Sequence, residues 1–160
     1  MMFKCGIGHD SHRFDPDETQ KPLVLGGIVF KGETGLEGNS DADVVLHALT
    51  NAVSGVSGVN ILGAVADELC LKRGIRDSSA YLQKGLETLD GMRIVHASVS
   101  IECSRPQIGP HVEAMKARIA QILSVDVSCV GITATSGEGL SAFGKGEGIQ
   151  AFAVVTAQKP

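Results

Sequence analysis

The sequence predicts an α+β fold in which a mixed β-sheet carries helices on one face. Two observations predict it: segments of alternating apolar and polar residues occur early, midway and late in the chain, and segments with helical periodicity lie between them. The 160 residues, 43% of them hydrophobic and 20% charged, suffice for one buried core. Since no repeat, linker or low-complexity stretch divides residues 1–160, we expect a single domain.

The first strand is expected over residues 3–10, where apolar and polar side chains alternate. A β-hairpin follows, because the apolar runs 23–25 and 28–30 flank Gly26-Gly27, and paired glycines favour a two-residue turn. The polar, glycine-rich residues 31–40 then predict a loop.

A first helix is expected from about Asp41 to Val53, with Asn39 or Ser40 as its cap. Acidic residues at its start suit the positive end of the helix dipole. Residues 56–77 show no clean period, and we interpret them as the helix end followed by a mobile loop.

Asp77 predicts the cap of a second helix that runs to about Leu89. Residues 93–104 are typical of a long strand, and residues 110–123 form an amphipathic helix that opens with a proline. The last two strands are expected at residues 127–135 and 149–157, joined by a glycine-rich loop.

The composition narrows the function class. The net charge of −4 argues against a non-specific nucleic-acid binder, although local cations and backbone amides still allow an anionic substrate. The four scattered cysteines, with no C-x-x-C pair, indicate reduced thiols in or near the core. With no apolar run of membrane-spanning length and no signal-peptide pattern at the start, we expect a cytoplasmic protein that does not bind membranes. The alternative is a plastid protein whose transit peptide has been removed.

Two short segments carry the densest chemistry. If residues 8–12 form a strand, alternation puts Asp10 and His12 on one face, and His47 reaches them if its helix packs there. Two imidazoles and one carboxylate are a common ligand set of catalytic zinc. Alternatively, the D-x-H pair is incidental and His47 is a hydrogen-bonded core histidine. Asp43, at i−4 from His47, either orients the imidazole or simply suits the helix start.

A second candidate site follows the strand predicted at residues 127–135. The hydroxyls of Thr135 and Ser136 suit phosphate oxygens, and Glu138 suits a hard divalent cation such as Mg²⁺ that bridges phosphates. Lys145 offers a charge that neutralises a phosphate. The alternative is a long glycine hairpin with solvated charges.

Residues 103–109 are a third candidate site, because a strand end that turns through proline offers backbone groups to a nucleotide base edge. The alternative is an ordinary strand-to-helix turn.

Together these segments resemble the 2-C-methyl-D-erythritol 2,4-cyclodiphosphate synthase family of the non-mevalonate isoprenoid pathway. The resemblance covers nearly the whole chain, in the same order. The motifs that carry it are G-x-G-x-D-x-H-R-F at Gly6–Phe14, L-G-G at Leu25–Gly27, S-D-x-D-V-x-L-H-A-L at Ser40–Leu49, P-x-x-x-P-H at Pro106–His111 and F-G-K-G-E-G-I at Phe143–Ile149.

The resemblance implies chorismate-mutase-like subunits in a homotrimer with active sites between adjacent subunits. The implied reaction cyclises 4-diphosphocytidyl-2-C-methyl-D-erythritol 2-phosphate, as its 2-phosphate attacks the β-phosphorus and releases CMP. The implied partners are this cytidine diphosphate-linked substrate and an isoprenoid diphosphate in the central cavity of the trimer.

The resemblance also implies the ligands. One Zn²⁺ per subunit would bind Asp10, His12 and His47, and a Mg²⁺ or Mn²⁺ on the substrate diphosphate would bind Glu138. Asn39 and Ser136 occupy the implied catalytic positions. The implied substrate-binding residues are Asp10, His12, Asn39, Ser40, Ile61, Leu62, Gly63, Cys103, Arg105, Gln107, Gly109, Thr135, Ser136, Glu138 and Lys145.

The chain departs from the family pattern at several of these positions. Asn39 stands where histidine is usual, Ser136 where threonine is common, and Lys145 where arginine is usual. Asparagine donates a hydrogen bond but carries no charge, and lysine lacks the bidentate fork of arginine. The usual D-I-G and F-P-D-T-D-P segments are I-L-G at residues 61–63 and A-D-E-L-C-L at residues 66–71.

Two other functions fit the same residues. One is a trimeric module that binds nucleotides or isoprenoid diphosphates without turnover, as Asn39 and the altered segment 61–71 suggest. The other is a metallohydrolase that uses the two histidines and the aspartate to activate water. Conversion of the substrate to a cyclic product distinguishes the synthase from both.

Overall fold

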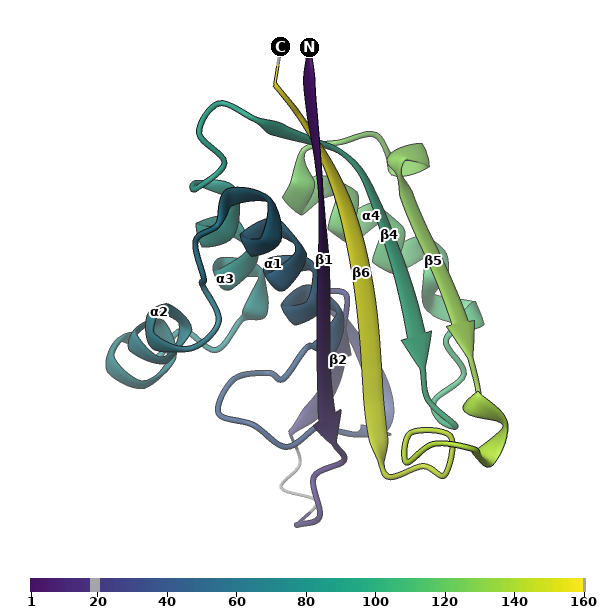
Figure 1. The fold of residues 1–160 in the computed structure, drawn as a ribbon. Coiled ribbons are helices and arrows are strands. Elements are labelled where there is room, and N and C mark those ends of the chain that lie inside the picture. Colours follow the sequence, from purple (N-terminus) through teal and green to yellow (C-terminus); the bar gives the residue numbers. More distant parts are fainter. Residues whose placement is uncertain (18–20, 160) are drawn as a thin grey trace.

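The computed structural model describes residues 1–17 and 21–159, and in these residues it shows a four-stranded mixed sheet beside a two-stranded one (Figure 1). The strands are β1 (Met2–Arg13), β2 (Pro22–Leu25), β3 (Ile28–Thr34), β4 (Arg93–Glu102), β5 (Val130–Thr135) and β6 (Gly148–Lys159). The α-helices are α1 (Val44–Ser57), α2 (Ala64–Asp67), α3 (Ser78–Leu86) and α4 (Val112–Leu123). The predicted α+β class is confirmed.

Short helical segments complete the chain. A π-helix, η1 (Glu68–Lys72), follows α2 directly, and 3₁₀ turns η2 (Gly109–His111), η3 (Val127–Cys129) and η4 (Gly137–Gly139) lie beside α4 and β5. Within residues 56–77 the predicted helix end is confirmed, because α1 extends to Ser57. The predicted mobile loop after it is wrong, because α2 and η1 occupy much of that stretch.

The main sheet has the strand order β1-β6-β4-β5, so β1 and β5 are its two edges. β6 pairs antiparallel with β1 and β4, whereas β4 and β5 are parallel. Met2 pairs with Lys159 at one end of the sheet, and Arg13 pairs with Gly148 at the other. The two chain ends consequently lie side by side, as both ribbon views show.

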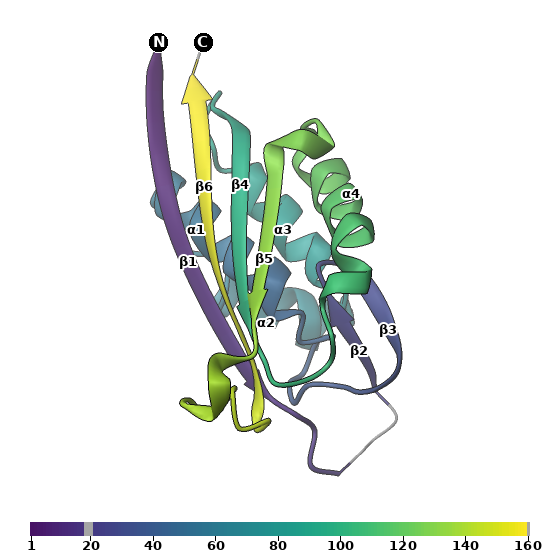
Figure 2. The same ribbon diagram turned by 90° about the vertical axis from the view of Figure 1, so that its right-hand side faces the viewer.

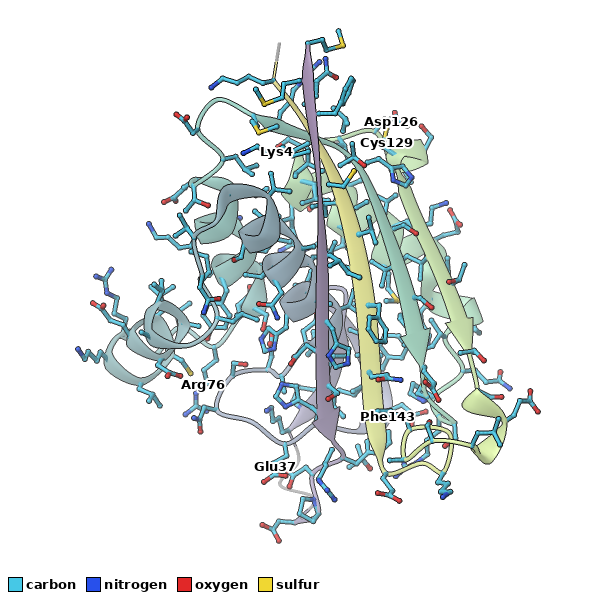
Figure 3. The ribbon with its side chains drawn as sticks, viewed as in Figure 1. Lys4, Glu37, Arg76, Asp126, Cys129 and Phe143 are labelled. Atoms are coloured by element: carbon cyan, nitrogen blue, oxygen red, sulfur yellow. The ribbon has the colours of Figure 1, made fainter. Side chains whose placement is uncertain are left out.

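The helices α1, α3 and α4 lie on the same side of the main sheet (Figure 2). Along β6, Ala151, Ala153 and Val155 face these helices and are buried, while Phe152 and Val154 face the other way and are exposed. No helix among the described segments covers that second face, and Figure 3 shows its side chains standing free along the strands.

Strand β1 and helix α1 approach one another with unusual closeness. A Cβ atom added at Gly6 would lie 2.0 Å from the carbonyl oxygen of Ala52, and one at Gly8 would lie 2.0 Å from that of Ala48. Only glycine fits at these two strand positions, because a methyl group needs a separation of about 3.5 Å from its neighbours.

The buried carboxylate of Asp43 joins α1 to the hairpin of β2 and β3. It accepts hydrogen bonds from the amides of Val45 and Leu46 as the cap of α1, and from the amides of Gly26 and Gly27 in the hairpin turn. Both turn glycines have positive φ, 60° and 75°, as the predicted two-residue turn requires. The prediction of Asn39 or Ser40 as the cap of this helix is therefore wrong.

The remaining predicted elements are confirmed with shifted ends. Asp77 caps α3 through the amide of Ser79, and α4 buries the stripe predicted for its amphipathic face. The cysteines are all unpaired, but Cys5 is exposed on the open face of the sheet and not near the core.

The described residues include no helix that is both long enough and apolar enough to cross a lipid bilayer.

The four amide donors around Asp43 generate a stability prediction. Asp43→Asn replaces one acceptor oxygen by an NH₂ group that faces an amide donor, and it removes the charge from the remaining bonds. We expect the free energy of unfolding to fall by about 2–3 kcal/mol in urea denaturation. Asp126→Asn is the control, since Asp126 caps only an exposed turn, and it should cost less. Equal stability of Asp43→Asn and the unaltered protein would contradict the bridging role.

Candidate functional site

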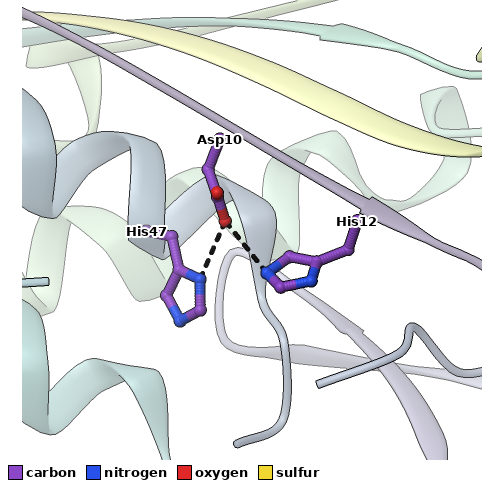
Figure 4. Close-up of side chains that lie close together, drawn as sticks. All are labelled: Asp10, His12 and His47. Carbon is purple, nitrogen blue, oxygen red and sulfur yellow. Dashed lines mark hydrogen bonds and ion pairs between the residues drawn. The ribbon is translucent and has the colours of Figure 1, made fainter. Parts of the chain in front are cut away.

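Three side chains from β1 and α1 converge beside the edge of the sheet (Figure 4). Asp10 and His12 project from the helix-facing side of β1, as strand alternation predicts, and His47 comes from α1, which packs on that side. Asp10 Oδ2 lies 3.2 Å from His12 Nε2 and 2.8 Å from His47 Nδ1. One potential ligand atom from each residue lies within 4.8 Å of the other two, so the predicted triad is assembled.

The surroundings of Asp10 keep its carboxylate charged. Burial by itself raises the pKa of Asp10, but hydrogen bonds from His12 and His47 outweigh it and hold the pKa well below its usual range. The carboxylate is therefore ionised at neutral pH. His47 is almost fully buried, whereas the side chains of Asp10 and His12 keep about a quarter of their surface exposed, which leaves the site open to a ligand.

The imidazole of His47 has a second partner that sequence analysis missed. Its Nε2 lies 2.8 Å from Ser78 Oγ, and this hydroxyl in turn donates to Asp41 Oδ1. The hypothesis that Asp43 orients this ring is wrong, because the Asp43 carboxylate is taken up by the four amides of the helix cap and hairpin. The only sequence signal for Ser78 was its place after the Asp77 cap.

A cleft opens beside the triad, and several predicted residues line it. Asn39 and Ser40 form one wall, and Leu62 and Gly63 form another. Ile61, in contrast, is buried in a small apolar cluster behind this wall. The cleft also includes Ala66, Asp67 and Cys70 of the altered segment 61–71, together with Gly38 and Tyr81, which were not predicted.

A second cleft, of about 340 Å³, lies where β4 and β5 end. It brings together most of segment 103–109 with Thr135 and Ser136, so two of the predicted sites become one. Burial, followed by the nearby Glu102 charge, raises the pKa of Cys103 to about 11, so the thiol is neutral. Arg105 is not part of the lining; its guanidinium stacks over the ring of Phe14, 4.2 Å from the centroid.

Glu138 and Lys145 lie in the loop between β5 and β6, and both are exposed. Glu138 adopts a left-handed backbone conformation with φ of 51°. The loop is fastened to the sheet by Glu102, which accepts hydrogen bonds from Ser141 and Gln150. Figure 3 shows Phe143 in the same loop, beside the end of β6. In this conformation the loop presents hydroxyls, a carboxylate and a lysine to solvent at one end of the sheet.

The two clefts are separate within one chain. The triad belongs to the edge strand β1, and the second cleft adjoins the opposite edge strand β5, with two strands between them. At a strand spacing of about 4.8 Å, the two edges are roughly 14 Å apart. No residue lines both clefts.

Comparisons with known proteins agree with one another. The model of the YgbB family matches residues 3–158. The chain is 49% identical over 156 residues to the 2-C-methyl-D-erythritol 2,4-cyclodiphosphate synthase of Chlamydia trachomatis serovar L2b (strain UCH-1/proctitis), covering 97% of this chain and 88% of that protein. The enzyme of the same name from Chlamydia muridarum is also 49% identical, with the same coverage.

Solved structures show the same likeness. A CDP-bound form of 2C-methyl-D-erythritol-2,4-cyclodiphosphate synthase superposes with a TM-score of 0.85 at 30% identity, covering 97% of this chain and all of that one. The bifunctional IspDF from Campylobacter jejuni gives a TM-score of 0.88 at 25% identity. It covers 99% of this chain, which in turn spans 43% of the bifunctional protein.

The triad geometry predicts zinc binding that depends on His12. At a Zn²⁺ concentration about 100-fold above the dissociation constant, binding should raise the melting temperature by roughly 5–10 °C in a thermal scan. His12→Ala should abolish most of this rise because it removes one of three ligands. His96→Ala is the matched control, since His96 is an exposed histidine of β4 away from the triad. A full zinc-induced rise in His12→Ala would remove His12 from the ligand set.

Proposed function

The chain belongs to the YgbB family, and we propose that it converts 4-diphosphocytidyl-2-C-methyl-D-erythritol 2-phosphate to 2-C-methyl-D-erythritol 2,4-cyclodiphosphate with release of CMP. The observation that carries the proposal is the assembled triad of Asp10, His12 and His47 in an open cleft. The names of the relatives at 49% identity support it, as does the likeness to a CDP-bound synthase.

The donor set fits a zinc ion. Two imidazole nitrogens and one carboxylate oxygen already face one another, and this set leaves a fourth position for substrate. Zn²⁺ bound there would act as a Lewis acid on a phosphate oxygen. The role of the chain is to hold three ligands in a site that is half closed by the walls of the cleft, so that the phosphate is oriented and its charge is screened.

The reaction does not require a strong general base. An oxygen of the 2-phosphate is already an anion, and it forms a bond to the β-phosphorus while the bond from that phosphorus to the CMP oxygen breaks. The bonding electron pair leaves with CMP as a phosphate anion. The demand on the protein is to place two repelling anions in line. Asn39, beside the triad, offers an amide donor to the attacking phosphate in the absence of a charged side chain at this position.

The second cleft would hold the cytidine end of the substrate. Segment 103–109 offers backbone groups and a neutral thiol around a cavity, and Thr135 and Ser136 adjoin it with hydroxyls for phosphate oxygens. The exposed carboxylate of Glu138 would ligate a Mg²⁺ or Mn²⁺ on the diphosphate, and Lys145 adds a positive charge in the same loop.

We propose that a homotrimer unites the two clefts. The two clefts adjoin opposite edges of one sheet. A substrate that contacts both clefts can therefore bind where β1 of one subunit lies beside β5 of the next. A repeated head-to-tail contact of this kind closes into a ring when the rotation between neighbouring subunits closes, as it does in a trimer. The uncovered sheet face supports the assembly, since it exposes 57% of Phe3, 69% of Ile7 and 44% of Phe152. An isoprenoid diphosphate would occupy the central cavity that these faces enclose.

The direct test of the function is phosphorus NMR of the purified protein with the proposed substrate and Mg²⁺. We expect cyclic diphosphate and CMP, and loss of both on pretreatment with a zinc chelator. Recovery of activity on adding Zn²⁺ back controls for damage by the chelator. A linear phosphate product would favour a metallohydrolase, and binding without turnover would favour a nucleotide-binding module; either result contradicts the synthase.

Coexpression of two inactive variants tests the shared site. His12→Ala disables the triad and Glu138→Ala disables the loop, so a mixed ring contains sites built from two intact halves. Random mixing should restore about one quarter of the wild-type activity. The control is His12→Ala with Asp10→Ala, which carry their defects in the same half and should restore none. Absence of recovery in the first pair would contradict a site formed between subunits.

A further inference from the structure

We infer that Ser78 is a positioning residue for His47: its hydroxyl, backed by Asp41, fixes the imidazole so that Nδ1 is presented to a metal ion. The inference rests on the zinc site of the proposed function and deepens it, because it identifies what holds a ligand in place. Neither Ser78 nor Asp41 touches the other two triad side chains by any hydrogen bond in the described residues.

The two nitrogens of His47 face two different partners. Nδ1 lies 2.8 Å from Asp10 Oδ2, on the side of the triad, and Nε2 lies 2.8 Å from Ser78 Oγ, on the side of α3. Ser78 is completely buried, and His47 is 8% exposed. The hydroxyl is therefore the partner of Nε2 and cannot be exchanged for bulk water without opening the helix packing.

Asp41 sets the direction of the hydrogen bonds. Its carboxylate oxygen Oδ1 accepts, and the hydroxyl of Ser78 donates its proton to it. The remaining lone pairs of Ser78 Oγ then face His47 Nε2, which must supply the proton of that bond. Because the hydroxyl accepts the Nε2 proton, the proton that stays on the ring when a metal takes the place of the Nδ1 proton is the one on Nε2, and Nδ1 is then the nitrogen that would bind the metal.

Two hydrogen bonds donated by backbone amides hold the segments of Asp41 and Ser78 next to each other. The amide of Ser78 donates to Asp41 Oδ2 at 3.0 Å, and the amide of Asp41 donates to the carbonyl of Arg76 at 2.9 Å. These bonds clamp the segment before α1 to the start of α3. Ser78 and Asp41 are thus fixed by contacts that involve none of the three triad side chains, which is the kind of support that holds a ligand side chain in one geometry.

The hydroxyl of Ser78 is not needed to start its own helix. Asp77 caps α3, and its side chain accepts from the amide of Ser79. The first helical residue therefore has a side chain that is free for a contact outside the helix, and that contact is His47.

The test is a Zn²⁺ titration of metal-free protein against a chromogenic chelator. Ser78→Ala should weaken zinc binding by roughly 10–100-fold, the range found when a partner of a metal-ligating histidine is removed. Asp41→Asn keeps one acceptor for the hydroxyl but loses the charge, so it should weaken binding less. Ser79→Ala is the matched control, a neighbouring buried serine whose side chain does not contact the triad, and it should leave zinc affinity unchanged.

A spectroscopic signature separates positioning from a loss of folding. In the zinc-loaded protein with ¹⁵N-labelled histidine, the Nε2 proton of His47 should be visible and slow to exchange, and in Ser78→Ala it should exchange rapidly. Circular dichroism checks that the variant is folded; if it is not, Asp41→Asn decides through the same two readouts.

The zinc titration distinguishes failure of this inference from failure of the proposed function. If the unaltered protein binds zinc and Ser78→Ala binds it equally well with the same Nε2 signal, the inference is overturned and the zinc site stands. If the unaltered protein binds no zinc, the metal centre of the proposed function fails, and the inference fails with it.

Discussion

The contact between β1 and α1 is the constraint on which the geometry of the Asp10, His12 and His47 triad depends. Gly6 and Gly8 bring the strand so near the helix that an added Cβ would stand 2.0 Å from helix carbonyl oxygens. A side chain at Gly8 would push away the turn of α1 that carries His47, since the oxygen concerned belongs to the next residue, Ala48. The 2.8 Å contact with Asp10 would then be lost. The two glycines, by having no side chain, therefore define the site as much as the three triad residues do.

Much of the fold and the triad could be predicted from the sequence because the signals are local. Alternation along β1 put Asp10 and His12 on one face, and the helical pattern around His47 offered a third ligand to that face. The turn at Gly26-Gly27 followed from the rarity of positive φ in other residues. The alternation and the turn needed only neighbours within a few positions. The meeting of His47 with Asp10, 37 residues away, needed in addition that α1 pack on that face, and the structure confirmed this.

The missed features depend on contacts between distant segments. Ser78 is 31 residues from His47, and no spacing rule connects them. The i−4 spacing suggested Asp43 as a partner of His47. Ala42, however, has φ of 54° and turns the chain, and the Asp43 carboxylate accepts from the hairpin amides while Asp41 accepts from Ser78. The π-helix at Glu68–Lys72 was not predicted, because its wider turn breaks the 3.6-residue period by which an α-helix is identified in a sequence. That the clefts are separate could be seen only from the strand order.

The pairing of Met2 with Lys159 fixes the place at which a second domain would be attached to this fold. Both chain ends leave the sheet at the same corner, and His12 lies ten residues along β1, which at about 3.3 Å per residue is roughly 33 Å away. A partner domain attached at either terminus would sit on that corner, clear of the cleft beside the triad. This arrangement allows the fold to be one domain of a longer chain. The bifunctional Campylobacter jejuni protein, of which this chain spans less than half, is an example.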